Sequence, residues 1–105
     1  MVNEEIQAIV ARFVETLNPK TVYLFGSYAR GDHNAHSDYD FYIVMPGKTA
    51  VTNNDAAKAY MSLCGMKRRP VDIIVNNEET FTKRASFLNT LEKTVSKEGE
   101  ILYER

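Results

Sequence analysis

The sequence has little that could stabilise it covalently or place it in a membrane. Its 105 residues include one cysteine, Cys64, which excludes an internal disulfide and a cysteine metal cluster. Because Cys64 lies among apolar residues, we expect a buried, unreactive thiol. No apolar run approaches the roughly 18 residues that span a bilayer, so we expect no membrane contact. The acidic start MVNEEIQ lacks a signal-peptide pattern, which favours a cytoplasmic protein.

An excess of charge of one sign is also absent. The chain has 13 basic and 14 acidic residues and a formal net charge of -1, so we do not expect nucleic acid as a partner. Its apolar share of 44% and charged share of 26% are typical of a soluble globular domain. This length suffices for one hydrophobic core, and we expect residues 1–105 to form a single domain.

Hydrophobic periodicity predicts an alternation of helices and short strands. The predicted helices cover residues 3–17, 54–66 and 81–97, with Thr80 as the cap of the last one and a single helical turn at 27–30. The predicted strands cover residues 21–25, 40–45 and 71–75, with a final strand or docked extension at 101–103. This order indicates an α+β fold in which a small mixed β-sheet is flanked by helices.

Most of the functional information lies in residues 26–44, which read GSYARGDHNAHSDYDFYIV. Gly26 allows a tight turn after an apolar strand, and Ser27 lies at a helix start, where phosphate is electrostatically favoured. Asp38 and Asp40 open the next strand. Because strand side chains alternate between faces, both carboxylates should project to the same side, about 7 Å apart. Such a pair resists burial unless a cation joins it.

A third carboxylate, Asp72, interrupts the otherwise apolar segment VDIIV. If its strand neighbours the one that begins at Asp40, Asp72 can face Asp38 and Asp40. Carboxylate oxygens suit Mg²⁺, and two such ions about 3.5–4 Å apart can activate an attacking oxygen and stabilise a leaving phosphate. Asp72 could also accept the proton of an attacking hydroxyl.

These residues together resemble the minimal nucleotidyltransferases of the DNA polymerase β-like nucleotidyltransferase superfamily, whose motif contains GSxARGxxxxxSDxD. The fixed positions of that pattern are all present: Gly26, Ser27, Ala29, Arg30, Gly31, Ser37, Asp38 and Asp40. The similarity covers essentially the whole chain and implies the polymerase β-like nucleotidyltransferase fold.

The resemblance also implies roles. Gly26 and Ser27 would bind a triphosphate, the three aspartates would bind Mg²⁺, with two ions expected, and Arg30 would support phosphate or pair with Asp38. The family reaction transfers a nucleoside monophosphate, usually AMP from ATP, to a hydroxyl group and releases pyrophosphate. Larger relatives carry a second domain for the acceptor, so we expect the acceptor here on another molecule.

Minimal members of the family are commonly paired with a separately encoded helical protein of the HEPN type, for which they act as antitoxins. We therefore expect a toxin–antitoxin role. Two alternatives stay open: a non-catalytic module that masks its partner, and a small-molecule adenylyltransferase whose acceptor pocket is built by a homo-oligomer. We expect His33 and His36 to be solvated rather than metal ligands. The basic run 67–69 is expected to be a solvated turn, with contact to phosphate or an acidic partner as the alternative.

Overall fold

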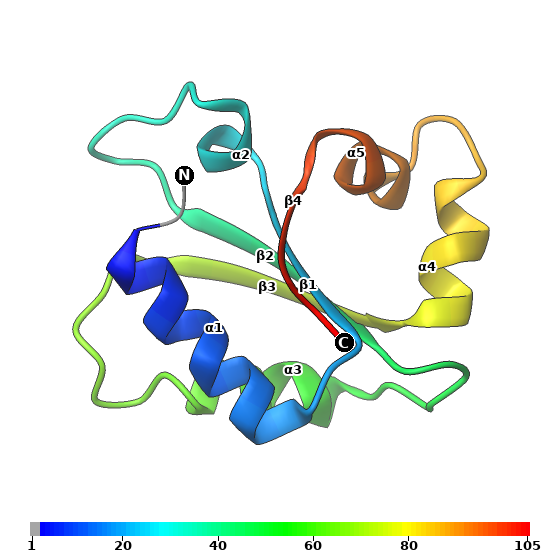
Figure 1. The fold of residues 1–105 in the computed structure, drawn as a ribbon, viewed down its shortest axis with the longest axis horizontal. Helices are drawn as coiled ribbons and strands as arrows, with labels where there is room; N and C mark the ends of the chain where they lie inside the picture. Colours follow the sequence, from blue (N-terminus) through cyan, green and yellow to red (C-terminus); the bar gives the residue numbers. More distant parts are fainter. Residues whose placement is uncertain (1–2) are drawn as a thin grey trace.

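A four-stranded sheet with helices on both faces organises the chain (Figure 1). The structure is a computed structural model that describes residues 3–105. Its elements are α1 (Glu4–Leu17), β1 (Thr21–Phe25), α2 (Ser27–Arg30), β2 (Tyr39–Met45), α3 (Asn53–Met61), β3 (Val71–Asn77), α4 (Glu78–Ala85), α5 (Leu91–Glu98) and β4 (Glu100–Glu104). The predicted mixed α+β architecture is confirmed, and of the two alternatives for residues 101–103 the structure shows the strand.

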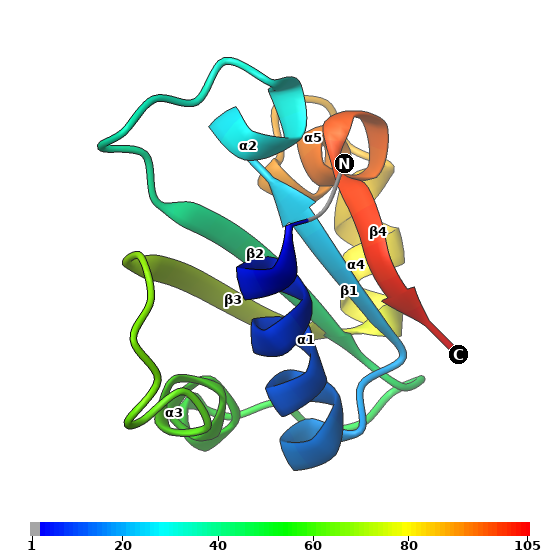
Figure 2. The same cartoon turned by 60° about the vertical axis from the view of Figure 1, so that its left-hand side comes forward.

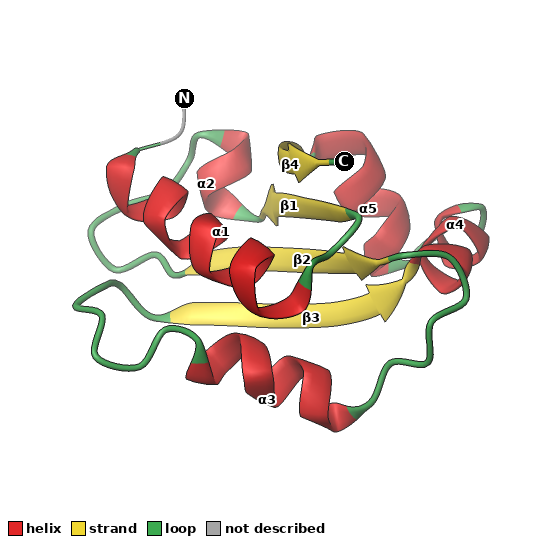
Figure 3. Cartoon of the chain, turned by 60° about the horizontal axis from the view of Figure 1, so that its bottom comes forward, coloured by secondary structure: helices red, strands yellow, loops and turns green. Residues whose placement is uncertain are grey.

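The strand order across the sheet is β3-β2-β1-β4 (Figure 3). Strand β1 runs antiparallel to both of its neighbours, whereas β2 and β3 are parallel and are joined by the crossover helix α3. The end of β1 therefore lies beside the start of β2, at the end of the sheet where β3 also starts, and Phe25 is the register partner of Asp40. This topology brings the Gly26 turn and the aspartates to the same end of the sheet.

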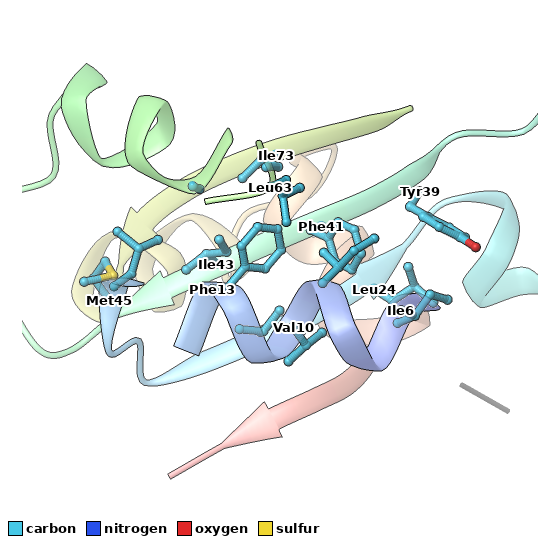
Figure 4. Packing of buried hydrophobic residues seen from close by; sticks show 14 residues of the cluster. Ile6, Val10, Phe13, Leu24, Tyr39, Phe41, Ile43, Met45, Leu63 and Ile73 are labelled. Carbon is cyan, nitrogen blue, oxygen red and sulfur yellow. The ribbon is translucent and has the colours of Figure 1, made fainter. Parts of the chain in front are cut away.

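One face of the sheet packs against α1 and α3 (Figure 2). Ile6, Val10 and Phe13 of α1 point toward the strands (Figure 4), and Phe13 meets Phe41 of β2 edge to face at 5.3 Å between ring centroids. Leu63, just beyond α3, and Ile73 of β3 extend this core. Burial of these apolar side chains stabilises the packing of α1 and α3 against the sheet.

The opposite face is covered by α4 and α5. Tyr42 and Val44 of β2 form a second buried cluster with Phe81 of α4 and Val95 of α5. Since side chains alternate along a strand, Asp40 lies on the same face as Tyr42, and Asp72 lies on the same face as Ile74. Both carboxylates therefore face away from α1 and α3.

The ends of α1 follow the predicted local chemistry. Asn3 caps the helix by accepting a hydrogen bond from the Ile6 N–H at 2.7 Å, and Asn18 ends it in the left-handed conformation with φ 51°. Within residues 3–105 no helix combines the length and the apolarity that crossing a bilayer requires.

The predicted helix over 54–66 is too long at its end. Helix α3 stops at Met61, and turns that include Gly65, with φ 78°, follow it. Cys64 lies in these turns and is exposed, so the prediction of a buried thiol is wrong. Tyr60 of α3 is 40% exposed, while its hydroxyl accepts the Ile73 N–H at 2.9 Å. That contact satisfies a donor on the edge strand β3.

The single helix predicted over 81–97 is two helices, α4 and α5. Asn89 between them is left-handed with φ 64°, and Thr90 caps α5 through the Lys93 N–H at 3.1 Å. Asn77 rather than Thr80 caps α4, accepting from the Thr80 N–H at 2.7 Å. The segment between α4 and α5 contains no glycine or proline, which is why the periodicity alone suggested one continuous helix.

Candidate active site

Gly26 joins the end of β1 to the start of α2 in a conformation that glycine alone adopts readily. Its φ of 77° and ψ of -154° fall in a region essentially closed to residues with a side chain. A Cβ atom at this position would also collide with Oδ2 of Asp40. The turn and the carboxylate are therefore in direct contact, and the glycine is required both by its conformation and by this contact.

Ser27 and Arg30 lie on the single turn of α2 that follows. Ser27 is partly buried and its carbonyl accepts the N–H groups of Gly31 and Asp32 at 2.9 and 3.1 Å. The exposed Arg30 pairs with Asp32 at 3.2 Å, so the predicted alternative of an ion pair with Asp38 is not what the structure shows. Gly31, between Arg30 and Asp32, ends the helical turn in the left-handed conformation with φ 84°.

Asp40 and Asp72 are direct register partners on the neighbouring strands β2 and β3. Asp40 is partly buried and Asp72 is exposed. Burial raises the pKa of Asp40 to about 6, helped by repulsion from Asp72 and Asp38 and by a hydrogen bond with Asp72, while Arg30 acts in the opposite direction. The ionised pair is therefore electrostatically strained in the absence of a cation.

Asp38 lies one residue before β2, at the end of an exposed loop. It is near enough to raise the pKa of Asp40, but no group of three or more metal-binding side chains converges anywhere in residues 3–105. The structure thus brings together Asp40, Asp72 and the Gly26 turn, with Asp38 at their border. The donor set still fits Mg²⁺, which binds through one or two carboxylates and completes its shell with water and substrate phosphates.

A buried polar network on the same face of the sheet was missed by sequence reasoning. Glu92 of α5 is buried and accepts hydrogen bonds from the Tyr42 hydroxyl at 2.7 Å and the Arg84 Nε at 2.9 Å. Asn76 donates to the Tyr42 hydroxyl at 3.1 Å. Burial alone would raise the pKa of Glu92, but the hydrogen bonds from Tyr42 and Arg84 outweigh it and lower that pKa. Glu92 lies one turn from Val95, and this acid on an apolar helix face was the available signal.

Residues 6–101 match the family described as nucleotidyltransferase domain. The chain belongs to this family. A proposed protein adenylyltransferase from Methanocaldococcus jannaschii is 32% identical over 84 residues, covering 80% of this chain and 78% of the relative. The predicted membership of the nucleotidyltransferases is thereby confirmed.

Solved structures agree on the fold. A proposed nucleotidyltransferase from Sulfolobus solfataricus is 27% identical with a TM-score of 0.64, over 94% of this chain and 77% of that chain. A toxin–antitoxin crystallised with AMP-PNP contains a chain that is 21% identical with a TM-score of 0.65, over 94% of this chain and 73% of that one. At 21% identity, the match to the toxin–antitoxin chain supports the fold alone.

Proposed function

We propose that the chain is a Mg²⁺-dependent adenylyltransferase that transfers AMP from ATP to a hydroxyl group of a partner protein. The observation that carries the proposal is the Asp40–Asp72 pair, which lies against the glycine turn of a nucleotidyltransferase domain. An electrostatically strained carboxylate pair beside a turn with no side chain suits a cation and a polyphosphate.

In this proposal each residue has a defined task. The backbone at Gly26 and the hydroxyl of Ser27 bind the triphosphate, and Arg30 adds positive charge at the phosphates. Asp40 and Asp72 hold Mg²⁺, and Asp38 joins them as a ligand when the nucleotide is bound, in a site for two ions. The bound Mg²⁺ offsets the negative charge of the phosphates.

The reaction balances without a further reagent. The oxygen of the acceptor hydroxyl forms a bond to the α-phosphorus, while the bond from that phosphorus to the bridging oxygen breaks. Pyrophosphate leaves with the electron pair. Asp72 is the more exposed of the paired carboxylates, and it takes the proton of the attacking hydroxyl.

The acceptor in this proposal is a separately encoded helical protein of the HEPN type, and the pair forms a toxin–antitoxin system. Two observations support it: a relative is named as a proposed protein adenylyltransferase, and a chain of the same fold comes from a toxin–antitoxin studied with AMP-PNP.

The test is transfer of label from α-labelled ATP to the partner in the presence of Mg²⁺. We expect transfer by the unaltered chain and a loss of about a hundredfold or more in Asp40→Asn and in Asp72→Asn. Glu79→Gln is the matched control, because this exposed carboxylate pairs with Lys48 at the other end of β3. Equal labelling by the aspartate variants would overturn the proposal.

A second candidate is a non-catalytic antitoxin that masks its partner by contact. It is favoured by the exposed apolar side chains of Phe87 and Leu88, which are 57% and 80% exposed between α4 and α5. Rescue of growth by the Asp40→Asn, Asp72→Asn double variant, together with loss of rescue in Phe87→Ser, Leu88→Ser, would favour masking over transfer.

A further inference from the structure

The loop over residues 31–38, here called the motif loop, is held by a residue from the basic run that precedes β3. The Arg69 guanidinium donates from Nη1 to the carbonyl oxygen of Ala35 at 2.7 Å. The two segments lie 34 positions apart in the sequence but on the same side of the molecule (Figure 2). Arg69 is partly buried, unlike the solvated cation that the sequence suggested.

The same guanidinium also reaches an aromatic column that leads into the core. Its carbon lies 5.9 Å from the ring centroid of Tyr28, within the range of a cation–π contact. His33 of the motif loop stacks on that tyrosine at 4.0 Å with an interplanar angle of 9°. Tyr28 in turn meets the fully buried ring of Tyr39 edge to face at 4.6 Å. Arg69 and the column thus tie the loop to the core at two points.

The loop itself has a folded tip. Asn34 Oδ1 accepts the His36 N–H at 2.8 Å, and Ser37 Oγ accepts the Asn34 N–H at 2.9 Å. The Tyr39 N–H then donates to the carbonyl of Pro70 at 3.1 Å, immediately beside Arg69. Asp38 lies between this tip and the first residue of β2, so its place is set by what holds the tip.

We infer that Arg69 is a positioning residue that places Asp38 for nucleotide-bound Mg²⁺, acting through the Ala35 carbonyl and the Tyr28–His33 stack. Asp38 itself is exposed at the end of the motif loop, so contacts that hold the loop against the rest of the fold limit its motion. A planar guanidinium can donate to a carbonyl while it lies over a ring, which a lysine ammonium cannot do equally well. This inference rests on the proposed function, because it assigns Asp38 to the metal and nucleotide site.

The experiment compares Arg69→Ala with Lys67→Ala, which removes the same charge from an exposed position two residues earlier. Affinity for AMP-PNP in the presence of Mg²⁺ is measured by calorimetry, and amide hydrogen exchange reports on residues 31–38. We expect Arg69→Ala to weaken binding about tenfold and to speed exchange in the motif loop, with Lys67→Ala unchanged. Arg69→Lys should be intermediate, and the melting temperature should move little.

One further variant and one further readout separate positioning from a general structural role. If Arg69→Ala fails to fold, His33→Ala removes the stack from an exposed position and should speed exchange in the same segment. In transfer assays, loss of positioning should raise the KM for Mg²⁺-ATP, while the melting temperature of the variant stays close to that of the parent.

The outcomes distinguish the two proposals. Unaltered protein that binds no AMP-PNP with Mg²⁺ would overturn the proposed function and this inference together. Unaltered protein that binds, while Arg69→Ala binds equally well or leaves loop exchange unchanged, would overturn the inference alone.

Discussion

Gly26 shows how one missing side chain can define a site. It has a left-handed φ of 77°, and its α-carbon faces the Asp40 carboxylate without room for a methyl group. Sequence reasoning identified the need for a small residue at this turn. The structure adds a second requirement for a small residue, which is the close contact with the Asp40 carboxylate. That contact depends on the pairing of β1 with β2.

We predict that Gly26→Ala destabilises the fold by about 1–3 kcal/mol and abolishes detectable nucleotide binding. The added methyl must displace either the turn or the Asp40 carboxylate. Gly65→Ala is the control, since Gly65 also has positive φ, 78°, but an added Cβ there meets no atom within 4 Å. Urea unfolding and calorimetry measure both effects, and equal nucleotide affinity in Gly26→Ala and the parent would contradict the prediction.

The raised pKa of Asp40 makes a second prediction at this scale. Because the folded-state pKa of about 6 lies above the ordinary 3.8, the native state binds the proton more tightly than the unfolded chain. The ionised carboxylate therefore reduces stability, in full above about pH 6 and not at all well below pH 3.8.

Asp40→Asn should accordingly raise the melting temperature at pH 7.5 in the presence of a chelator and have little effect at pH 3.5. After allowance for solvent screening at this partly exposed group, the expected gain is a few tenths of a kcal/mol to about 1 kcal/mol. Differential scanning fluorimetry at the two pH values tests this. A lower melting temperature than the parent at pH 7.5 would contradict it.

Among the elements, α5 depends on the buried Glu92 that ties it to β2 and α4. The pKa of Glu92 is lowered, so the stabilisation that its carboxylate provides is present above about pH 4.5. This stabilisation is lost as the pH falls through the folded-state pKa. We predict that Glu92→Gln lowers the free energy of unfolding by about 2 kcal/mol at pH 7 and by much less near pH 3.

Glu98→Gln on the same helix is the matched control for Glu92, because Glu98 is exposed. Chemical unfolding at a series of pH values distinguishes the two, since the Glu92 variant should have the flatter profile. Parallel profiles for the parent and Glu92→Gln would show that the carboxylate is not stabilised in the folded state.

The elements also show where local sequence information ends. The helix at the start of the chain and the strands over 21–25, 40–45 and 71–75 were predictable, because amphipathic periodicity and strong turn residues coincide there. The break between α4 and α5 was not predictable, since Asn89 and Thr90 are weaker helix-ending signals than glycine or proline. Exposure of Cys64 follows from the early end of α3, a property of how the crossover meets β3.

The candidate site also has features that the sequence predicts and features that only the fold determines. An acid inside an apolar strand pointed to Asp72, and the motif pointed to Asp40, so both candidate residues could be identified from the sequence. Their direct pairing depends on the parallel register of β2 and β3, which no local pattern specifies. The tie of Arg69 to Ala35 and the burial of Glu92 beneath Tyr42 are likewise long-range contacts that only the fold determines.

Across the whole molecule, β4 completes the sheet by covering β1, which would otherwise be an edge. Leu102 and Tyr103 of β4 pack against the main core, and the Arg105 N–H donates to the Lys20 carbonyl at 3.1 Å. The last strand thereby fixes the position of the strand that carries the Gly26 turn.

We predict that deletion of residues 100–105 lowers the free energy of unfolding by about 2–4 kcal/mol, from the loss of two partly buried apolar side chains and of a strand pairing. That is a large share of the stability of a small domain. Ile101→Thr in the same strand is the control and should change the free energy of unfolding little, because the Ile101 side chain is half exposed. A truncated chain that unfolds at the same urea concentration as the parent would contradict the prediction.

The exposed thiol of Cys64 offers a practical route into these questions. It follows α3, on the face of the sheet turned away from Asp40 and Asp72, and no second cysteine competes for a label. A fluorophore or spin label coupled there could be used to detect the partner that we propose, without engineered cysteines and without altering the carboxylates. The exposure of Cys64 thus provides a native attachment point for following, in real time, the binding of the proposed partner.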